Sequence, residues 1–213
     1  MDFGELLKAV GEEPVFETGF LLVGEVNPDD VRRQLSRWVR AGRLYQIRRG
    51  LYALAPPFQK VKPHPFLVAN RLMRGSYVSL QSALAQYGLI PEHVPVTTSV
   101  TTGRPGRWQT ALGTYEFRHI RSGFLTGYRL LDLGGGQEAF VATPEKALLD
   151  LIHLEPGADA PEYLRELRVQ HLESLSLEEL RRLAELSGRP KLIRAVRRIS
   201  RLAKTEALDY EAL

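Results

Sequence analysis

The chain has 213 residues, 44% of them hydrophobic, and a formal net charge of +4 at pH 7 with a pI of about 9.4. It contains no cysteine, which excludes disulfides and thiolate metal sites and is typical of a reducing compartment. No stretch approaches the roughly 18 continuous apolar residues of a membrane span, and the acidic N-terminus lacks a signal-peptide pattern. These features predict a cytoplasmic protein with one good core and a small second module.

The charge is distributed unevenly along the chain. Residues 1–25 carry one base and six acids, whereas residues 26–62 carry nine bases and two acids. A second basic block at 188–204 has seven bases and no acid. This segregation indicates a polyanionic partner more strongly than the overall charge does.

The first part of the chain has the pattern of three helices followed by a β-hairpin. Helices are expected over residues 2–10 and 17–24, and a third begins at Asn27, which is a good N-cap. Residues 44–54 then read as two strands around a tight turn. This order predicts a winged helix-turn-helix over residues 1–56.

The third helix divides into an apolar and a cationic side. Val31, Leu35 and Trp38 fall on one face. No acid follows Asp30 in this helix, so local i,i+4 ion pairs are not expected to neutralise its arginines. A basic helix that follows a shorter one is typical of a recognition helix in the DNA major groove, where arginine bonds guanine or phosphate. The opposite, cationic face consists of Arg32, Arg33, Ser36, Arg37 and Arg40.

The hairpin tip adds two further bases, Arg48 and Arg49. A wing in this position would reach a neighbouring phosphate or the minor groove. A solvated basic face would also explain any one of these features alone. Helix, hairpin and element order together favour a surface that binds double-stranded DNA.

Four prolines, at 56, 57, 63 and 65, mark a boundary, because they do not fit regular helix or central strand. An α+β protein is therefore predicted, with a second, mixed domain at 64–213 that has an antiparallel sheet and C-terminal helices. The expected helices lie at 65–73, 76–88, 143–154 and 190–204, with others between, and the expected strands lie at 94–102, 113–120, 127–133 and 138–142.

No catalytic, cofactor or metal site is expected in this second domain. Glu145, Lys146 and Asp150 could suggest a metal nuclease, but helix-dipole compensation explains Glu145, and no carboxylates converge from strands. The glycines and arginines of "TTSVTTGRPGRW" lack the phosphate-loop pattern, so a turn between strands is favoured. Arg104 and Arg107 stay open as nucleic-acid contacts.

The last helix carries a basic stripe opposite its apolar side. The stripe is either a solvated helix face or a second patch that binds DNA backbone or an acidic protein. Its members are Lys191, Arg194, Arg197, Arg198 and Arg201.

Several separated motifs resemble those of the AbiEi-type antitoxins of bacterial abortive-infection systems, a group also described as predicted transcriptional regulators of viral (phage) defence. The motifs are "PDDVRRQLSRWVRAGRLYQIRRGLYAL", "YVSLQSALAQYGLIPE", "TTSVTTGRPGRWQTALGTYEFRHI", "GYRLL" and "ATPEKALLDLIHL". The resemblance spans about residues 3–200, and Arg32, Arg33, Arg37 and Arg40 match the family's DNA-binding element by position. It assigns antitoxicity to the C-terminal domain without naming single residues.

The resemblance implies a repressor of its own operon that counteracts a nucleotidyltransferase toxin as part of a type IV toxin–antitoxin system. The expected partners are double-stranded operator DNA and that toxin, with no stable complex between the two proteins. A homodimer on the DNA is left open. No membrane partner is expected. Two alternatives remain beside it: a nucleic-acid-processing enzyme with a catalytic C-terminal domain, and a purely protein-binding wing.

Overall fold

The structure is a computed structural model that describes residues 1–23, 26–91, 94–167 and 171–211. Over these residues the protein is α+β, with eight α-helices, a three-stranded antiparallel sheet and a six-stranded mixed sheet. None of the helices in the described ranges is long and apolar enough to cross a membrane.

The N-terminal part begins with a short helix and ends with the expected hairpin. The predicted first helix, third helix and hairpin are confirmed, whereas the predicted second helix is a short strand and one 3-10 turn; Gly24, its last predicted residue, lies outside the described residues. The three strands pair antiparallel in the order β1-β3-β2. The elements are α1 (Phe3–Val10), β1 (Phe16–Glu17), η1 (Thr18–Leu21), α2 (Pro28–Arg40), β2 (Leu44–Arg48) and β3 (Leu51–Leu54).

Strand β3 is buried on both of its faces. Tyr52 and Leu54 belong to a small core shared with α1 and α2. Leu51 and Ala53 point the other way and belong to the large core that also contains α3 and the second sheet. The alternation follows from the two-residue period of a strand. One sheet therefore joins the two hydrophobic cores.

The rest of the chain alternates short strands and helices. The predicted strands at 94–102, 113–120, 127–133 and 138–142 are confirmed as β5, β7, β8 and β9, and the predicted helix 65–73 as α3. Two strands were not predicted, β4 and β6. The predicted helix 76–88 is wrong at its start, because Ser76–Val78 pair with β5 and β9 as strand β4, and only Leu80–Gln86 form helix α4. The elements are α3 (Pro65–Leu72), β4 (Ser76–Val78), α4 (Leu80–Gln86), β5 (Val96–Thr101), β6 (Gly106–Thr110), β7 (Gly113–His119), η2 (Ser122–Phe124), β8 (Tyr128–Asp132), β9 (Glu138–Ala142), α5 (Pro144–Leu154), α6 (Pro161–Glu166), η3 (Leu172–Ser174), α7 (Leu177–Ser187) and α8 (Pro190–Glu211).

The larger sheet is mixed, so the prediction of an antiparallel sheet is wrong. Its order is β6-β7-β5-β4-β9-β8, with β5 parallel to β7 and β4 parallel to β9. The hairpins β6–β7 and β8–β9 are antiparallel, as consecutive strands with tight turns usually are. Each hairpin, however, places its second strand beside an earlier strand that runs in the same direction. This order cannot be read from the short turns alone.

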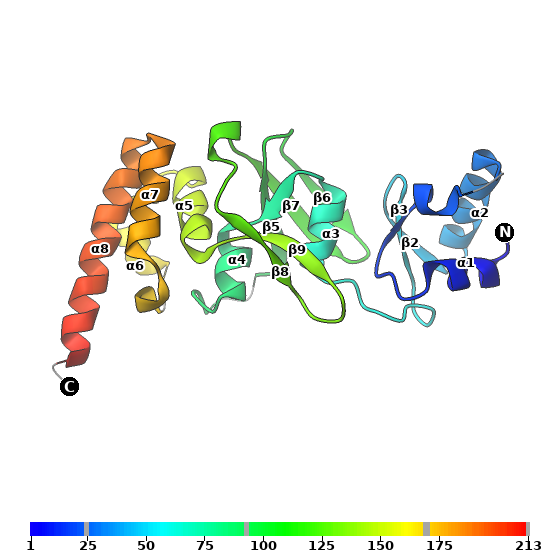
Figure 1. The fold of residues 1–213 in the computed structure, drawn as a ribbon, viewed down its shortest axis with the longest axis horizontal. Coiled ribbons are helices and arrows are strands. Elements are labelled where there is room, and N and C mark those ends of the chain that lie inside the picture. The colour runs from blue at the N-terminus through cyan, green and yellow to red at the C-terminus, as the bar shows by residue number, and fades with distance from the viewer. Residues whose placement is uncertain (24–25, 92–93, 168–170, 212–213) are drawn as a thin grey trace.

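Strands β4 and β9 both lead directly into helices, α4 and α5, which pack against each other. Beyond them α5 packs on α7, and α7 on α8. Figure 1 shows the result, an elongated molecule with α1 and α2 at one end, the larger sheet in the middle and α7 and α8 at the other end. The two candidate basic surfaces, on α2 and α8, therefore lie far apart.

Candidate nucleic-acid interface

Local signals and a small core fix the orientation of α2. The Asn27 side chain accepts a hydrogen bond from the Asp29 backbone N–H at 2.9 Å, and Pro28 occupies the first helical position. Val31 and Leu35 are buried, at 1% and 0% exposure. Because these two residues face the core, the opposite side of the helix is held toward solvent.

All five residues predicted for the cationic face of α2 are exposed, as the helical spacing requires. The sequence predicted that acids of the same helix would not neutralise these arginines, and this prediction is wrong for the first turn of α2. Arg32 Nη1 lies 2.8 Å from Asp29 Oδ1, and Arg33 is paired with Asp30, in both cases at i,i+3 spacing. Exposed pairs of this kind are weak, so phosphate can replace the carboxylate.

The second half of the face has no such partners. Arg37 and Arg40 are exposed, and neither makes an ion pair with any residue that the structure describes. They also lie in the last turn of α2, where their positive charge interacts favourably with the negative end of the helix dipole. The unneutralised positive charge of α2 is therefore concentrated at Arg37 and Arg40.

The two arginines at the hairpin tip have different surroundings. Arg49 is exposed in the turn between β2 and β3. Arg48 is only partly exposed; its guanidinium donates to the Arg71 carbonyl at 3.2 Å and lies 3.7 Å from Glu17. Arg74 binds the same Glu17 at 2.7 Å. Arg48 thus connects the hairpin to α3, and of the two predicted contacts only Arg49 is oriented toward solvent.

A hollow of about 600 Å³ lies between the start of α2 and the hairpin turn. It brings Arg32 and Arg49 to one surface, together with the polar side chains of Gln46 and Thr18. The hollow therefore places one arginine of the helix and one of the hairpin turn on the same surface, which sequence spacing alone could not establish.

Several residues of the predicted basic stripe on α8 already have partners within the protein. Arg194 pairs with Asp159 at 2.9 Å, and Arg198 donates to the Asp159 carbonyl. Lys191 donates to the Glu155 carbonyl. These contacts attach α8 to the segment after α5. Arg201 has an interaction of its own as well, and both Arg197 and Arg201 line a cavity between α7 and α8.

A buried ionic network, which the sequence did not predict, lies where α5 crosses β4. Lys146 and Asp150 are both 0% exposed and form an ion pair one helical turn apart. The second oxygen of Asp150 accepts from Ser79 Oγ at 2.7 Å and from Tyr77 Oη at 3.0 Å. Burial raises the pKa of the Asp150 carboxyl and lowers the pKa of the Lys146 ammonium.

This network contains the residue types of a catalytic site, but its charged groups are buried from solvent. The Lys146 ammonium lies 3.5 Å from the centroid of the Phe124 ring, which covers it. Ser79 is also 0% exposed. The neighbouring Glu145 accepts a hydrogen bond from the Ser176 backbone N–H at 2.9 Å and so joins α5 to the start of α7. As folded, these residues are buried and hold neighbouring elements together.

The remaining motifs are turns or connections. Arg104 and Arg107 are exposed beside the turn that leads into β6. Gln137, after the triple glycine, binds the His64 N–H at 2.7 Å and the Lys62 carbonyl at 3.1 Å, which holds the proline-rich segment against the β8–β9 turn. Within the described ranges, no group of three His, Asp or Glu side chains could hold a metal ion.

Comparison with protein-family models and with curated proteins found no match to this chain. The candidate interface therefore rests on its own geometry, and it consists of the exposed face of α2, the hollow beside it and Arg49.

Proposed function

We propose that this protein is a transcriptional repressor that binds double-stranded DNA through a winged helix-turn-helix formed by residues 1–56. The observation that carries the proposal is the exposed pair Arg37 and Arg40, which has no ion-pair partner in the described chain and lies opposite the buried side of α2. Unpaired guanidinium groups on a fixed helix face suit guanine edges and phosphates.

The order of elements supports this reading. A helix, a short strand and a 3-10 turn precede the basic helix α2, and a β-hairpin follows it. In a winged helix-turn-helix, the helix before the hairpin enters the major groove and the hairpin reaches adjacent backbone. In this arrangement α2 is the recognition helix, β2–β3 is the wing, and α1 packs behind both.

The residues of the interface divide into two roles. In this proposal Arg33, Arg37 and Arg40 contact the groove, and Ser36 is the neutral hydrogen-bonding group on the same face. Arg32 and Arg49, which border the hollow between helix and wing, are proposed to bind phosphate. Phosphate contacts set affinity and register, whereas base contacts set sequence preference.

Titration of a fluorescent promoter fragment from the protein's own operon tests this proposal. Because phosphate neutralisation releases counterions, affinity should fall steeply and log-linearly with salt, by roughly 10³-fold between 50 and 200 mM for about six contacts. Binding that does not change with salt, or that is equal for any unrelated protein of the same net charge, would count against it.

We further propose that the protein acts as an antitoxin to a nucleotidyltransferase toxin and represses the operon that encodes both. This proposal rests on the resemblance of the motifs between residues 3 and 200 to AbiEi-type antitoxins. The second domain, residues 64–213, would carry the antitoxic role, since α2 is assigned to DNA.

A growth-rescue assay in cells that express the toxin gene from the same locus tests the antitoxic role. Wild-type protein and the variant Arg37→Ala/Arg40→Ala should rescue growth equally, because repression and antitoxicity reside in different parts of the chain. If neither protein restores growth while both accumulate, the chain is a regulator without antitoxic activity.

A further inference from the structure

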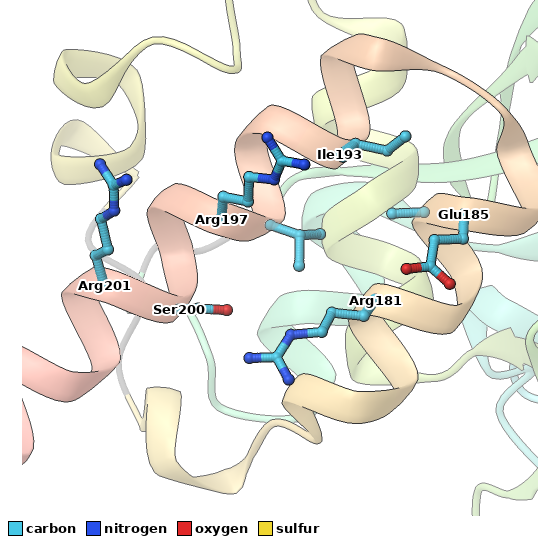
Figure 2. A pocket seen from close by; sticks show the side chains of 8 residues that line it. Arg181, Glu185, Ile193, Arg197, Ser200 and Arg201 are labelled. Carbon is cyan, nitrogen blue, oxygen red and sulfur yellow. The ribbon is translucent and has the colours of Figure 1, made fainter.

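A cavity of about 290 Å³ lies between α7 and α8, at the end of the molecule opposite α2. Its walls come from both helices, and it is close to the lower size limit of small-molecule sites. Figure 2 shows its lining, with Arg181 and Glu185 on α7 and Arg197, Ser200 and Arg201 on α8. None of these residues belongs to the proposed DNA interface.

The lining carries three arginines and one glutamate, a net formal charge of +2. Arg181 and Arg197 are exposed, and neither pairs with an acid in the part of the chain that the structure describes, although Glu185 is in the same wall. Arg201 already has another interaction, so the argument depends on the first two. Two guanidinium groups with unused donors favour an anion that accepts several hydrogen bonds.

Ser200 supplies an independent sign of a missing partner. The residue is 9% exposed, and its Oγ is buried without a hydrogen-bond partner among the residues that the structure describes. A helical serine commonly satisfies its hydroxyl by donating to a carbonyl one turn earlier, and Ser200 does not. Figure 2 shows the hydroxyl directed into the space between α7 and α8, with Arg181 extending toward it. A buried unsatisfied hydroxyl is costly unless a ligand or water completes it.

The remaining wall is apolar, formed by Ala184, Ile193 and Val196. A ligand that fits every side of the cavity therefore combines an anionic group with a small apolar group. We propose that this cavity binds a small phosphate monoester, its phosphate held by Arg181, Arg197 and Ser200 and its organic group lying on the apolar wall. A monoester carries a charge of about −1.5 to −2 at neutral pH and three acceptor oxygens, which suit the guanidinium groups of Arg181 and Arg197.

Calorimetric titration of the full chain with phenyl phosphate, inorganic phosphate and phenol tests the proposal, with a thermal-shift assay as second readout. Phenyl phosphate should bind at one site and more tightly than inorganic phosphate, and phenol should not bind measurably. Arg181→Ala and Arg197→Ala should each weaken phenyl phosphate about tenfold or more, and Ser200→Ala by a few fold, because each removes hydrogen bonds to a charged ligand.

Arg182→Ala is the matched control, because Arg182 is an exposed arginine of the same helix that pairs with Glu179 outside the cavity. It should leave binding of phenyl phosphate unchanged. The proposal is overturned if phenyl phosphate binds neither by heat nor by thermal shift, if inorganic phosphate binds as tightly, or if the cavity variants and the control behave alike. It is also overturned if Arg181→Ala and Arg197→Ala lower affinity for duplex DNA but not for phenyl phosphate.

Discussion

At the residue scale, Arg48 and Arg49 are adjacent in sequence but differ in what they contact. Arg49→Ala should weaken binding to every duplex alike, because a phosphate contact carries no sequence information. Arg48→Ala should instead lower the unfolding free energy by about 1–2 kcal/mol, through loss of its partly buried contacts with Glu17 and the Arg71 carbonyl. Urea unfolding and duplex titration of both variants separate the two roles. Similar DNA defects with unchanged stability would show that both arginines contact DNA.

Lys146 and Asp150 present a different situation, a fully buried ion pair. Lys146→Met or Asp150→Asn should each cost about 3–5 kcal/mol, because either change leaves an uncompensated polar or charged group in the core. The double variant Lys146→Met/Asp150→Asn should cost much less than the sum of the two single costs. Urea unfolding measures all three. Additive costs would mean that the two side chains do not stabilise each other.

His153 should make stability depend on pH. Burial, assisted by the nearby charge of Arg189, lowers its pKa from 6.5 to about 4. The unfolded chain therefore binds a proton near pH 6.5 that the folded protein accepts only near pH 4. Because protonation favours the unfolded chain, the contribution of neutral His153 to the unfolding free energy is complete above pH 6.5 and is lost as the pH falls toward 4. Between pH 6.5 and pH 4, the unfolding free energy of His153→Gln should fall by about 1–3 kcal/mol less than that of wild type, as measured by urea unfolding.

The control for His153 is His119→Gln, since His119 is an exposed histidine at the end of β7. Between pH 4 and 6.5, the unfolding free energy of His153→Gln should change less with pH than that of this control variant. A His153→Gln profile that follows wild type would contradict the assignment.

At the element scale, the turn into β8 packs closely on α5. Gly127 has φ +74°, and a Cβ atom there would lie 3.0 Å from Cβ and Cγ of Lys146. Gly134 has a similar φ of +77° with nothing within 4 Å. Both alanine variants carry the cost of a left-handed backbone, but only Gly127→Ala adds a clash, worth about 1–3 kcal/mol more. Equal melting temperatures for the two variants would show that α5 moves to accept the methyl group.

The elements that the sequence predicted are those with local signals. Helix α2 has its cap Asn27, Pro28 and a regular apolar spacing, and it begins where expected. Strand β4 could not be predicted, because its three residues adjoin a helical pattern and it is stabilised by pairing with β5 and β9, distant in the chain. The parallel pairings were missed for the same reason, since no turn encodes them.

The candidate site follows the same division. Exposure of Arg37 and Arg40 was predictable from helical spacing, whereas the partners of Arg48 and Arg198 come from segments far along the chain. The carbonyl of Asp159, which accepts from Arg198, gives no signal in a sequence pattern. The sequence therefore predicted which arginines are exposed, whereas the structure was needed to show which of them already have hydrogen-bond or ion-pair partners.

At the scale of the whole molecule, positive charge is exposed on two separate ends with different surroundings. The α2 face is an open convex helix surface beside a hollow, whereas the arginines between α7 and α8 surround a small cavity. A duplex suits the first, and a small anion suits the second. The central claim of this account is that DNA binding depends on the α2 face and not on net charge.

The most direct test compares two double charge reversals of equal size by fluorescence anisotropy on one promoter duplex at one salt concentration. The first is Arg37→Glu/Arg40→Glu, and the second is Arg104→Glu/Arg107→Glu, which changes exposed residues at the β5–β6 turn. The first variant should bind at least roughly 100-fold more weakly than wild type, and the second within about fivefold of it. Equal losses in both variants, or wild-type affinity in the first, would contradict the claim.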